Sequence, residues 1–198
     1  APAGSRRSLS GLVGGVQTTG EIVADAAGTY ARPLAAAQPI GPGDSGRVTL
    51  ATAEGNTFHA SFHVLEVEVT LGARLISGRA SLGSNVAATL TGADGTAKGT
   101  GTTSLRNSED FQIAGGRGSA IGAVAAGDMV SVTQSSTLAG ASLTLNGVIP
   151  SLDASVNLAQ NRIDGRAPAG AAVTIEIQSP YGTNYTRSAV ADAAGRFA

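Results

Sequence analysis

The chain has 198 residues, a net charge of −1 at pH 7 and only 14% charged residues, which argues against a nucleic-acid partner or an acidic membrane surface. Cysteine is absent, so disulfides and cysteine-ligated metal sites are excluded. Aromatic residues make up 4% and Trp is absent, which leaves few stacking platforms for single-stranded nucleic acid or sugar rings. The apolar residues form no run of about 18, so the sequence predicts no membrane span.

Apolar and polar residues alternate along most of the chain, which predicts β-strands and no helix. In residues 65–71 (LEVEVTL), the apolar side chains are expected to face a core while Glu66, Glu68 and Thr70 face outward. Glycine, aspartate and proline punctuate the alternation at roughly the 8–12-residue spacing of β-sandwiches, and Asn146-Gly147 is expected to be a tight turn. The same alternation predicts strands at residues 47–53, 56–64, 129–133, 141–145, 155–158 and 173–177.

The chain also repeats itself. Four short stretches recur in the same order, which a chance match would not produce. They are ISGRASLGSNVAATL (76–90) with IDGRAPAGAAVTIEI (163–177), APAG (1–4) with APAG (167–170), ADAAGTYA (24–31) with ADAAGRFA (191–198), and GPGDSGRVTL (41–50) with VAAGDMVSVT (124–133).

The repeats divide the chain into three staggered copies. Residues 1–71 are expected to be a copy that lacks its first strand, residues 72–160 a complete copy, and residues 161–198 the first half of a third copy. A unit of roughly 80–87 residues with about seven strands is most simply built as two antiparallel sheets packed face to face. The predicted fold is therefore all-β, a tandem array of antiparallel β-sandwiches.

The repeated motifs, ISGRA and IDGRAPAGAAV, DAAGRF and DAAGTY, GPGDSGRV and AAGDMVSV, resemble the immunoglobulin-like and carboxypeptidase-regulatory-like repeats of secreted and cell-surface bacterial proteins. The cysteine pair and the tryptophan of antibody domains are absent, so the resemblance does not extend to true immunoglobulins. It implies spacers, stalks or adhesive modules outside the cell. It carries over no catalytic, cofactor-binding or metal-binding residue.

The stretch around Ser45 contains the letters G-D-S-G that surround the nucleophile of trypsin-like proteases. In the second copy, however, Met129 stands at the position of Ser45, and the preceding Gly-Asp is the part that recurs. Both histidines come after Ser45 in the chain, whereas the trypsin-like order places His first. The stretch is therefore predicted to be a turn, in which Gly supplies backbone freedom and Asp a side-chain hydrogen bond.

Other candidate sites give weaker signals. His59 and His63 lie on a predicted strand, where four residues span about 13 Å, so they are expected to face solvent and not to share a metal ion. Calcium sites need several converging oxygen donors, but Asp25, Asp94 and Asp192 each stand alone in a turn and are expected to form Asx turns. Glu66 and Glu68 share an outward strand face, without the cleft that a glycosidase pair needs.

Two surface features are also candidates. Tyr181 and Tyr185 are expected at a hairpin tip, where exposed tyrosines can contact a sugar or a neighbouring domain. Asn184-Tyr185-Thr186 fits the N-glycosylation pattern. Arg6-Arg7 and the other basic residues form no patch in the sequence.

The leading hypothesis is a non-enzymatic extracellular structural repeat protein that forms a surface stalk, coat or filament. The split copies at the two ends have two explanations. Either these residues are an excerpt of a longer array, or the C-terminal half of one molecule docks onto the N-terminal copy of the next, which would be head-to-tail self-association by strand complementation. The alternative is a carbohydrate- or surface-binding, adhesin-like module of a secreted protein or phage particle, whose partners would be surface glycans. Neither hypothesis requires a cofactor.

Overall fold

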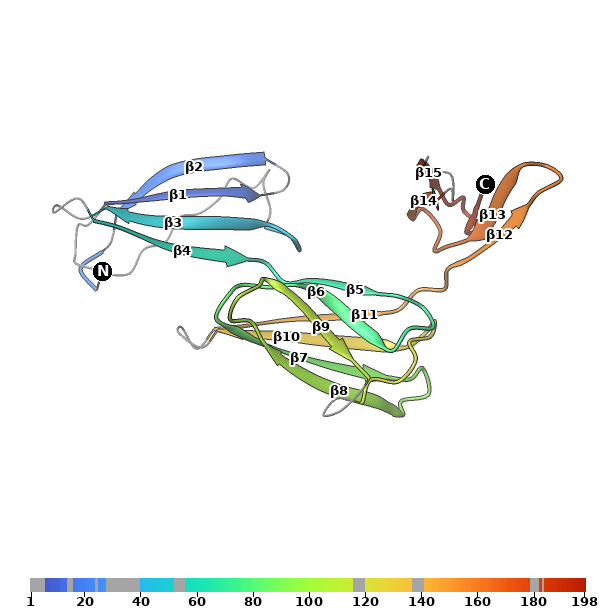
Figure 1. Ribbon diagram of the computed structural model, residues 1–198, viewed down its shortest axis with the longest axis horizontal. Helices are drawn as coiled ribbons and strands as arrows, with labels where there is room; N and C mark the ends of the chain where they lie inside the picture. Colours follow the sequence, from blue (N-terminus) through green and yellow to red (C-terminus); the bar gives the residue numbers. More distant parts are fainter. Residues whose placement is uncertain are drawn as a thin grey trace.

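All the regular structure in the described part of the chain is β-strand (Figure 1). The computed structural model describes residues 6–13, 16–23, 25–27, 40–51, 56–115, 120–136, 141–178, 182 and 184–198. The strands pair in antiparallel sheets, so the all-β prediction is confirmed. In these residues there is no helix long and apolar enough to cross a membrane.

The first four strands form one sheet, which we call the N-terminal sheet. Its order is β2-β1-β3-β4, so the hairpins β1–β2 and β3–β4 lie side by side and β4 is an edge strand. The strands are β1 (Arg6–Val13), β2 (Val16–Val23), β3 (Ser45–Ala51) and β4 (Thr57–His63).

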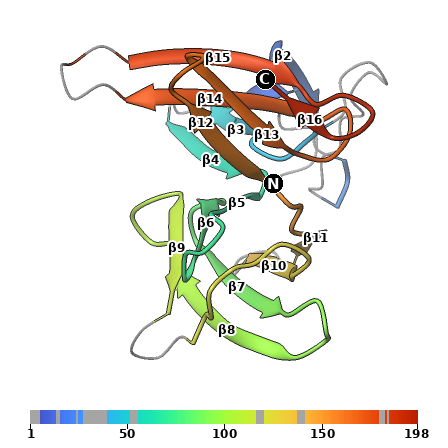
Figure 2. The ribbon, with the colours of Figure 1, turned by 90° about the vertical axis from the view of Figure 1, so that its right-hand side faces the viewer.

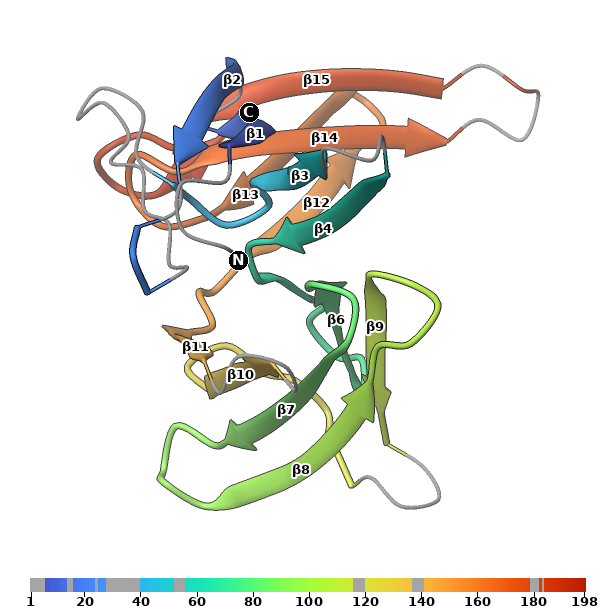
Figure 3. The same ribbon diagram turned by 90° about the vertical axis from the view of Figure 1, so that its left-hand side faces the viewer.

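The next seven strands form the middle sandwich, in which two antiparallel sheets face each other (Figures 2 and 3). One sheet has the order β5-β6-β9 and the other β11-β10-β7-β8. The strands are β5 (Glu66–Val69), β6 (Leu75–Arg79), β7 (Ser84–Thr91), β8 (Ala97–Ser104), β9 (Asp110–Ala114), β10 (Met129–Ser136) and β11 (Ser142–Val148).

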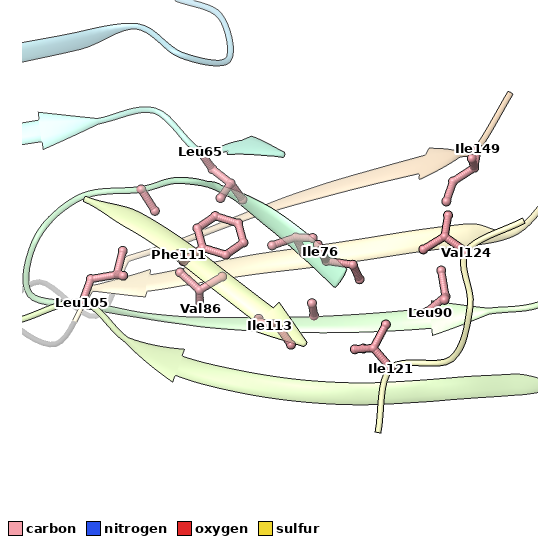
Figure 4. Packing of buried hydrophobic residues seen from close by; sticks show 13 residues of the cluster. Leu65, Ile76, Val86, Leu90, Leu105, Phe111, Ile113, Ile121, Val124 and Ile149 are labelled. Carbon is pink, nitrogen blue, oxygen red and sulfur yellow. The ribbon is translucent and has the colours of Figure 1, made fainter. Parts of the chain in front are cut away.

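The core of the middle sandwich lies between these two sheets (Figure 4). In β7 the buried and exposed positions alternate strictly, so that Val86, Ala88 and Leu90 point into the core. The period-two pattern of the sequence is thus realised as burial. The buried members are Leu65, Ile76, Ala80, Val86, Ala88, Leu90, Leu105, Phe111, Ile113, Ile121, Val124, Val132 and Ile149.

The last five strands form the C-terminal unit, in which β12-β13-β16 make one sheet and β14-β15 a separate hairpin. Its core is small: Ala167, Ala191 and Phe197 are buried, and four partly buried residues pack against them. The strands are β12 (Asp153–Asn157), β13 (Arg162–Arg166), β14 (Ala172–Gln178), β15 (Asn184–Val190) and β16 (Arg196–Phe197).

The three groups of strands repeat one pairing scheme. The N-terminal sheet β2-β1-β3-β4 has the order of β8-β7-β10-β11, and β12-β13-β16 has the order of β5-β6-β9. The registers also agree with the sequence repeat: Leu12 pairs with Ser45 where Thr91 pairs with Met129. Sequence similarity and strand register therefore identify the same equivalent positions.

In the middle sandwich and in the C-terminal unit, the first strand precedes the I-x-G-R-A motif. Strand β5 pairs with β6, and β12 pairs with β13. The sequence boundaries at residues 71/72 and 160/161 therefore fall between paired strands, and residues 66–71 belong with the strands that come after them. Leu65 is buried as expected, but Leu71 is 36% exposed because β5 ends at Val69.

The glycine of the I-x-G-R-A motif makes room for an aromatic ring. Gly78 pairs with Phe111, and Gly165 pairs with Phe197 in the same register. A Cβ on Gly78 would lie 1.9 Å from the carbonyl oxygen of Glu66 and 2.9 Å from the Phe111 ring. A Cβ on Gly165 would lie 2.3 Å from the Phe197 ring. Each phenylalanine therefore packs over bare backbone on the neighbouring strand.

Replacing Gly78 by Ala should destabilise the middle sandwich by about 3 kcal/mol or more, because backbone on β5 and the Phe111 ring would both have to move. Faster amide exchange of peptides from β7 and β10, measured by mass spectrometry, would report the loss. Gly147→Ala is the matched control, since no atom lies within 4 Å of its added Cβ. Equal protection in Gly78→Ala and the wild type would contradict this account of the motif.

Candidate functional site

The G-D-S-G stretch is a turn closed by its aspartate. Asp44 is 7% exposed, and its Oδ2 accepts a hydrogen bond of 2.7 Å from the N–H of Gly41. Gly43 has φ of 83°, in the left-handed region that glycine occupies without strain. The Asp44 carbonyl accepts from the N–H of Val64 at 2.7 Å, which ties the end of β4 to the turn. The turn prediction is confirmed.

The second copy builds the same turn. Asp128 is buried, its Oδ2 accepts from the N–H of Ala125 at 2.8 Å, and Gly127 has φ of 84°. The Asp128 carbonyl accepts from the N–H of Ile149 at 2.7 Å, just beyond β11. The recurring Gly-Asp therefore anchors the last strand of the N-terminal sheet and of the middle sandwich.

A lysine adds a charge pair to the second turn. Nζ of Lys98, on β8, donates to Oδ2 of Asp128 over 2.6 Å. The hydrogen bond from Lys98 holds the pKa of Asp128 below its ordinary value, against the opposing effect of burial. The pair joins strand β8 to the turn before β10, and this makes it a structural contact.

The structure brings Ser45 and His63 together, which the sequence alone did not indicate. They are directly opposite residues on β3 and β4. His63 is 3% exposed, however, and neither ring nitrogen has a hydrogen-bond partner, so the contact between nucleophile and base that serine catalysis uses is not formed. The prediction that His63 faces solvent was wrong, because the end of β4 meets Ser81 and Glu109 of the middle sandwich. His59 is exposed as expected.

The isolated aspartates form the expected Asx turns. Oδ1 of Asp25 accepts from the N–H of Ala27, and Oδ1 of Asp192 accepts from the N–H of Ala194. Oδ1 of Asp94 accepts from both the N–H and the hydroxyl of Thr96, and that hydroxyl lowers the pKa of Asp94. The structure groups no three His, Asp or Glu side chains into a metal site within the residues it describes.

The remaining candidates lie on the surface. Glu66 and Glu68 are exposed on β5, as the alternation predicted. Tyr185 is 51% exposed and lines a hollow of about 670 Å³ in the C-terminal unit, together with Ile175 and Ile177. Tyr181 and the side chains of Arg6 and Arg7 lie outside what the structure describes. A second hollow of about 600 Å³ is lined by Asp153, Asp164, Asp192, Arg162, Arg166 and Arg196.

Comparison with known proteins identifies no family for this chain. No family model matches it, and no curated protein matches it. A solved structure described as a tetra-tandem repeat in the extending region of a large adhesion protein is similar, with 14% identity and a TM-score of 0.30. The alignment covers 99% of this chain and 58% of the length of that one. A TM-score of this size is too low to establish a common fold.

Replacing Asp128 by Asn should lower the stability of the middle sandwich at pH 7 by about 1–3 kcal/mol, because it removes the charge that Lys98 meets. Since the folded-state pKa of Asp128 is lowered, its contribution is present above the ordinary aspartate pKa and is lost as the pH falls through the folded value. The difference between variant and wild type should therefore shrink with acidification below about pH 4.

Urea unfolding at a series of pH values, with exchange protection of β10 as a second readout, measures this difference. Glu68→Gln, at an exposed position on β5, is the control and should change little. A constant difference across the pH range would contradict a role for the Asp128 charge.

Proposed function

We propose that this chain is a non-enzymatic structural repeat protein of the cell surface or extracellular space, in which β-sandwich units extend a stalk, coat or filament. The observation that carries the proposal is the repeated pairing scheme: the N-terminal sheet pairs its strands in the order of one sheet of the middle sandwich, and β12-β13-β16 pair in the order of the other. Chains of stacked repeats commonly serve as extended scaffolds.

The recurring residues support a structural role because each of them holds strands together. Gly78 and Gly165 admit a phenylalanine ring, and Asp44 and Asp128 close turns. The serine of G-D-S-G does not recur, since Met129 takes its place. At these recurring positions, what the copies share is therefore packing and turn chemistry.

The strand order supports an immunoglobulin-like unit. Labelling β5 to β11 as A to G makes the first sheet A-B-E and the second G-F-C with one further strand beside C. These are the sheets of an immunoglobulin-type sandwich in which the fourth strand joins the second sheet. The unit lacks cysteine, so packing of the two apolar faces stabilises it without a disulfide.

The exposed edge and face of β14 support self-association. Strand β7 pairs with both β8 and β10, whereas its counterpart β14 pairs in the described part only with β15. Val86 and Leu90 are fully buried, but at the equivalent positions Val173 is half-buried and Ile177 is 43% exposed. The exposed edge and face of β14 fit a hairpin like β10–β11; β3–β4 of a second copy has that form, and so would a hairpin further along a longer chain.

Because β3 already pairs with β1, this association is an exchange of strands, in which pairing with β14 replaces the pairing with β1. The result is a head-to-tail filament of identical chains.

The alternative, a glycan-binding module, has one observation in its favour. Tyr185 and Arg187 line the same hollow in the C-terminal unit, and a tyrosine beside a hydrogen-bond donor is a common sugar-binding arrangement. Specific binding on a glycan array, lost in Tyr185→Ala, would favour this alternative.

Replacing Ile177 by Lys should weaken self-association by about tenfold or more, which corresponds to about 1.4 kcal/mol, because a charge would enter the covered face. Ile177 is not among the residues packed on the small core of the C-terminal unit, so the unit should still fold. Sedimentation velocity over a range of concentrations, with electron microscopy of the same samples, gives the measurement.

Glu176→Lys is the matched control, because Glu176 lies next in sequence on the opposite face of β14 and should not affect assembly. A wild-type chain that stays monomeric at every concentration would contradict strand exchange while leaving the repeat role intact.

A further inference from the structure

The two junctions between units start from the same geometry. Strand β4 ends at His63 and β11 ends at Val148, and the cross-strand registers make these residues counterparts. The residue after each of them donates its N–H to the carbonyl of a turn aspartate, Val64 to Asp44 and Ile149 to Asp128, at 2.7 Å in both cases. Beyond these hydrogen bonds the two junctions are built differently.

At the first junction, one serine hydroxyl hydrogen-bonds to the backbone groups that a neighbouring strand would otherwise pair with. Oγ of Ser81 accepts from the N–H of His63 at 2.8 Å and donates to the carbonyl of His63 at 2.9 Å. Because β4 is an edge strand, these backbone groups have no partner among the strands that the structure describes. Ser84 in turn donates its hydroxyl to the Ser81 carbonyl, which fixes the turn that carries Ser81.

The His63 side chain contacts a second loop of the middle sandwich, the one that carries Glu109. Its ring is buried, and Nδ1 lies 3.7 Å from Oε2 of Glu109. Glu109 is held in place by Arg79 at 3.2 Å, and Arg79 also pairs with Asp110. Two loops of the middle sandwich therefore contact His63 at the end of the N-terminal sheet.

At the second junction, the equivalent positions offer no such groups. Ala80 and Ala167 donate to the carbonyls of Glu109 and Gly195, which identifies Gly195 as the counterpart of Glu109 and Pro168 as the counterpart of Ser81. Pro168 has no hydroxyl and Gly195 has no carboxylate. Val148, the counterpart of His63, is 68% exposed.

The linkers at the two junctions also differ, both in length and in burial. Between Val64 and β5 stands a single residue, Leu65, which is fully buried in the core of the middle sandwich. Between Ile149 and β12 stand Pro150, Ser151 and Leu152, all of them exposed. The second linker is therefore longer and packs on neither unit.

We propose that the first junction is a rigid joint, held by the two hydrogen bonds of Ser81 to the His63 backbone and by burial of the His63 ring beside Glu109, and that the second junction is a hinge. The chain then consists of a stiff segment, the N-terminal sheet with the middle sandwich, and an articulated C-terminal unit after it. A repeat array of this kind bends at its flexible junctions and stays straight at its rigid ones.

The absence of native cysteine allows a direct test by spin labelling of the 198-residue chain. Labels on Thr57→Cys and Thr102→Cys span the first junction, and labels on Thr102→Cys and Arg187→Cys span the second; all three positions are exposed. Pulsed electron–electron double resonance should give a narrow distribution of label-to-label distances across the first junction and a broad one across the second. Equal widths in the wild-type background would overturn the proposal whatever the variants do.

Ser81→Ala should broaden the first distribution by about twofold, since it removes two hydrogen bonds from the strand end. Ser81→Thr keeps the hydroxyl and should restore the narrow distribution, and Ser151→Ala in the second linker should change neither distribution. Amide exchange of β7 and β10 reports whether the middle sandwich stays folded. An unchanged width in Ser81→Ala with that sandwich intact would overturn the role of the Ser81 hydrogen bonds.

Discussion

The two sheets of the middle sandwich bury their apolar faces against each other. The rest of the structure depends on how completely the corresponding apolar face is covered in each of the other units. Burial of apolar area is the main favourable term in folding, at about 25 cal/mol per Å². Leu65 is fully buried where its counterpart Leu152 is 52% exposed, and Leu90 is 1% exposed where its counterpart Ile177 is 43% exposed. The same strand pattern therefore produces a closed core in one place and an open apolar surface in another.

The contacts that recur between units all serve this closure. A glycine on β6 or β13 lets a phenylalanine lie over the sheet, and a buried aspartate ties the last strand of a unit to the turn before it. Both devices position strands from well-separated parts of the chain, and neither presents a reactive group to solvent. A protein whose repeated chemistry is confined to strand placement is suited to bear load or to space other modules, which is the role we propose.

The sequence was sufficient for features that depend on neighbouring residues. Alternation predicted strands such as β3, β4, β5, β10 and β14, the Gly-Asp turn was identified by comparing Ser45 with Met129, and the Asx turns at Asp94 and Asp192 could be inferred from local hydrogen bonding. The first strand of each unit was harder to place, because EVEV of β5 and DASVN of β12 have little in common. Their equivalence rests on pairing with β6 and β13, which sequence similarity does not encode.

Contacts between distant residues were not predictable. Lys98 and Asp128 are thirty positions apart and meet only when β8 lies beside the turn before β10. The burial of His63 depends on Ser81 and Glu109 from another unit. Asn146-Gly147, predicted as a tight turn, lies inside β11 instead, because pairing with β10 continues through both residues. In each case tertiary pairing determined the outcome and local preference did not.

The hairpins β1–β2, β7–β8 and β14–β15 occupy the same place in the three groups of strands, and cross-strand disulfides can show whether they pair at the same positions. The counterpart pairs Ser10–Thr19, Thr89–Thr100 and Glu176–Thr186 are directly opposite on their strands, so cysteines placed at each pair should cross-link on mild oxidation. Shifting one cysteine by a single residue moves it to the other face and should abolish the cross-link. Cross-linking of the shifted pairs, or of the pair in only one unit, would contradict a common repeat.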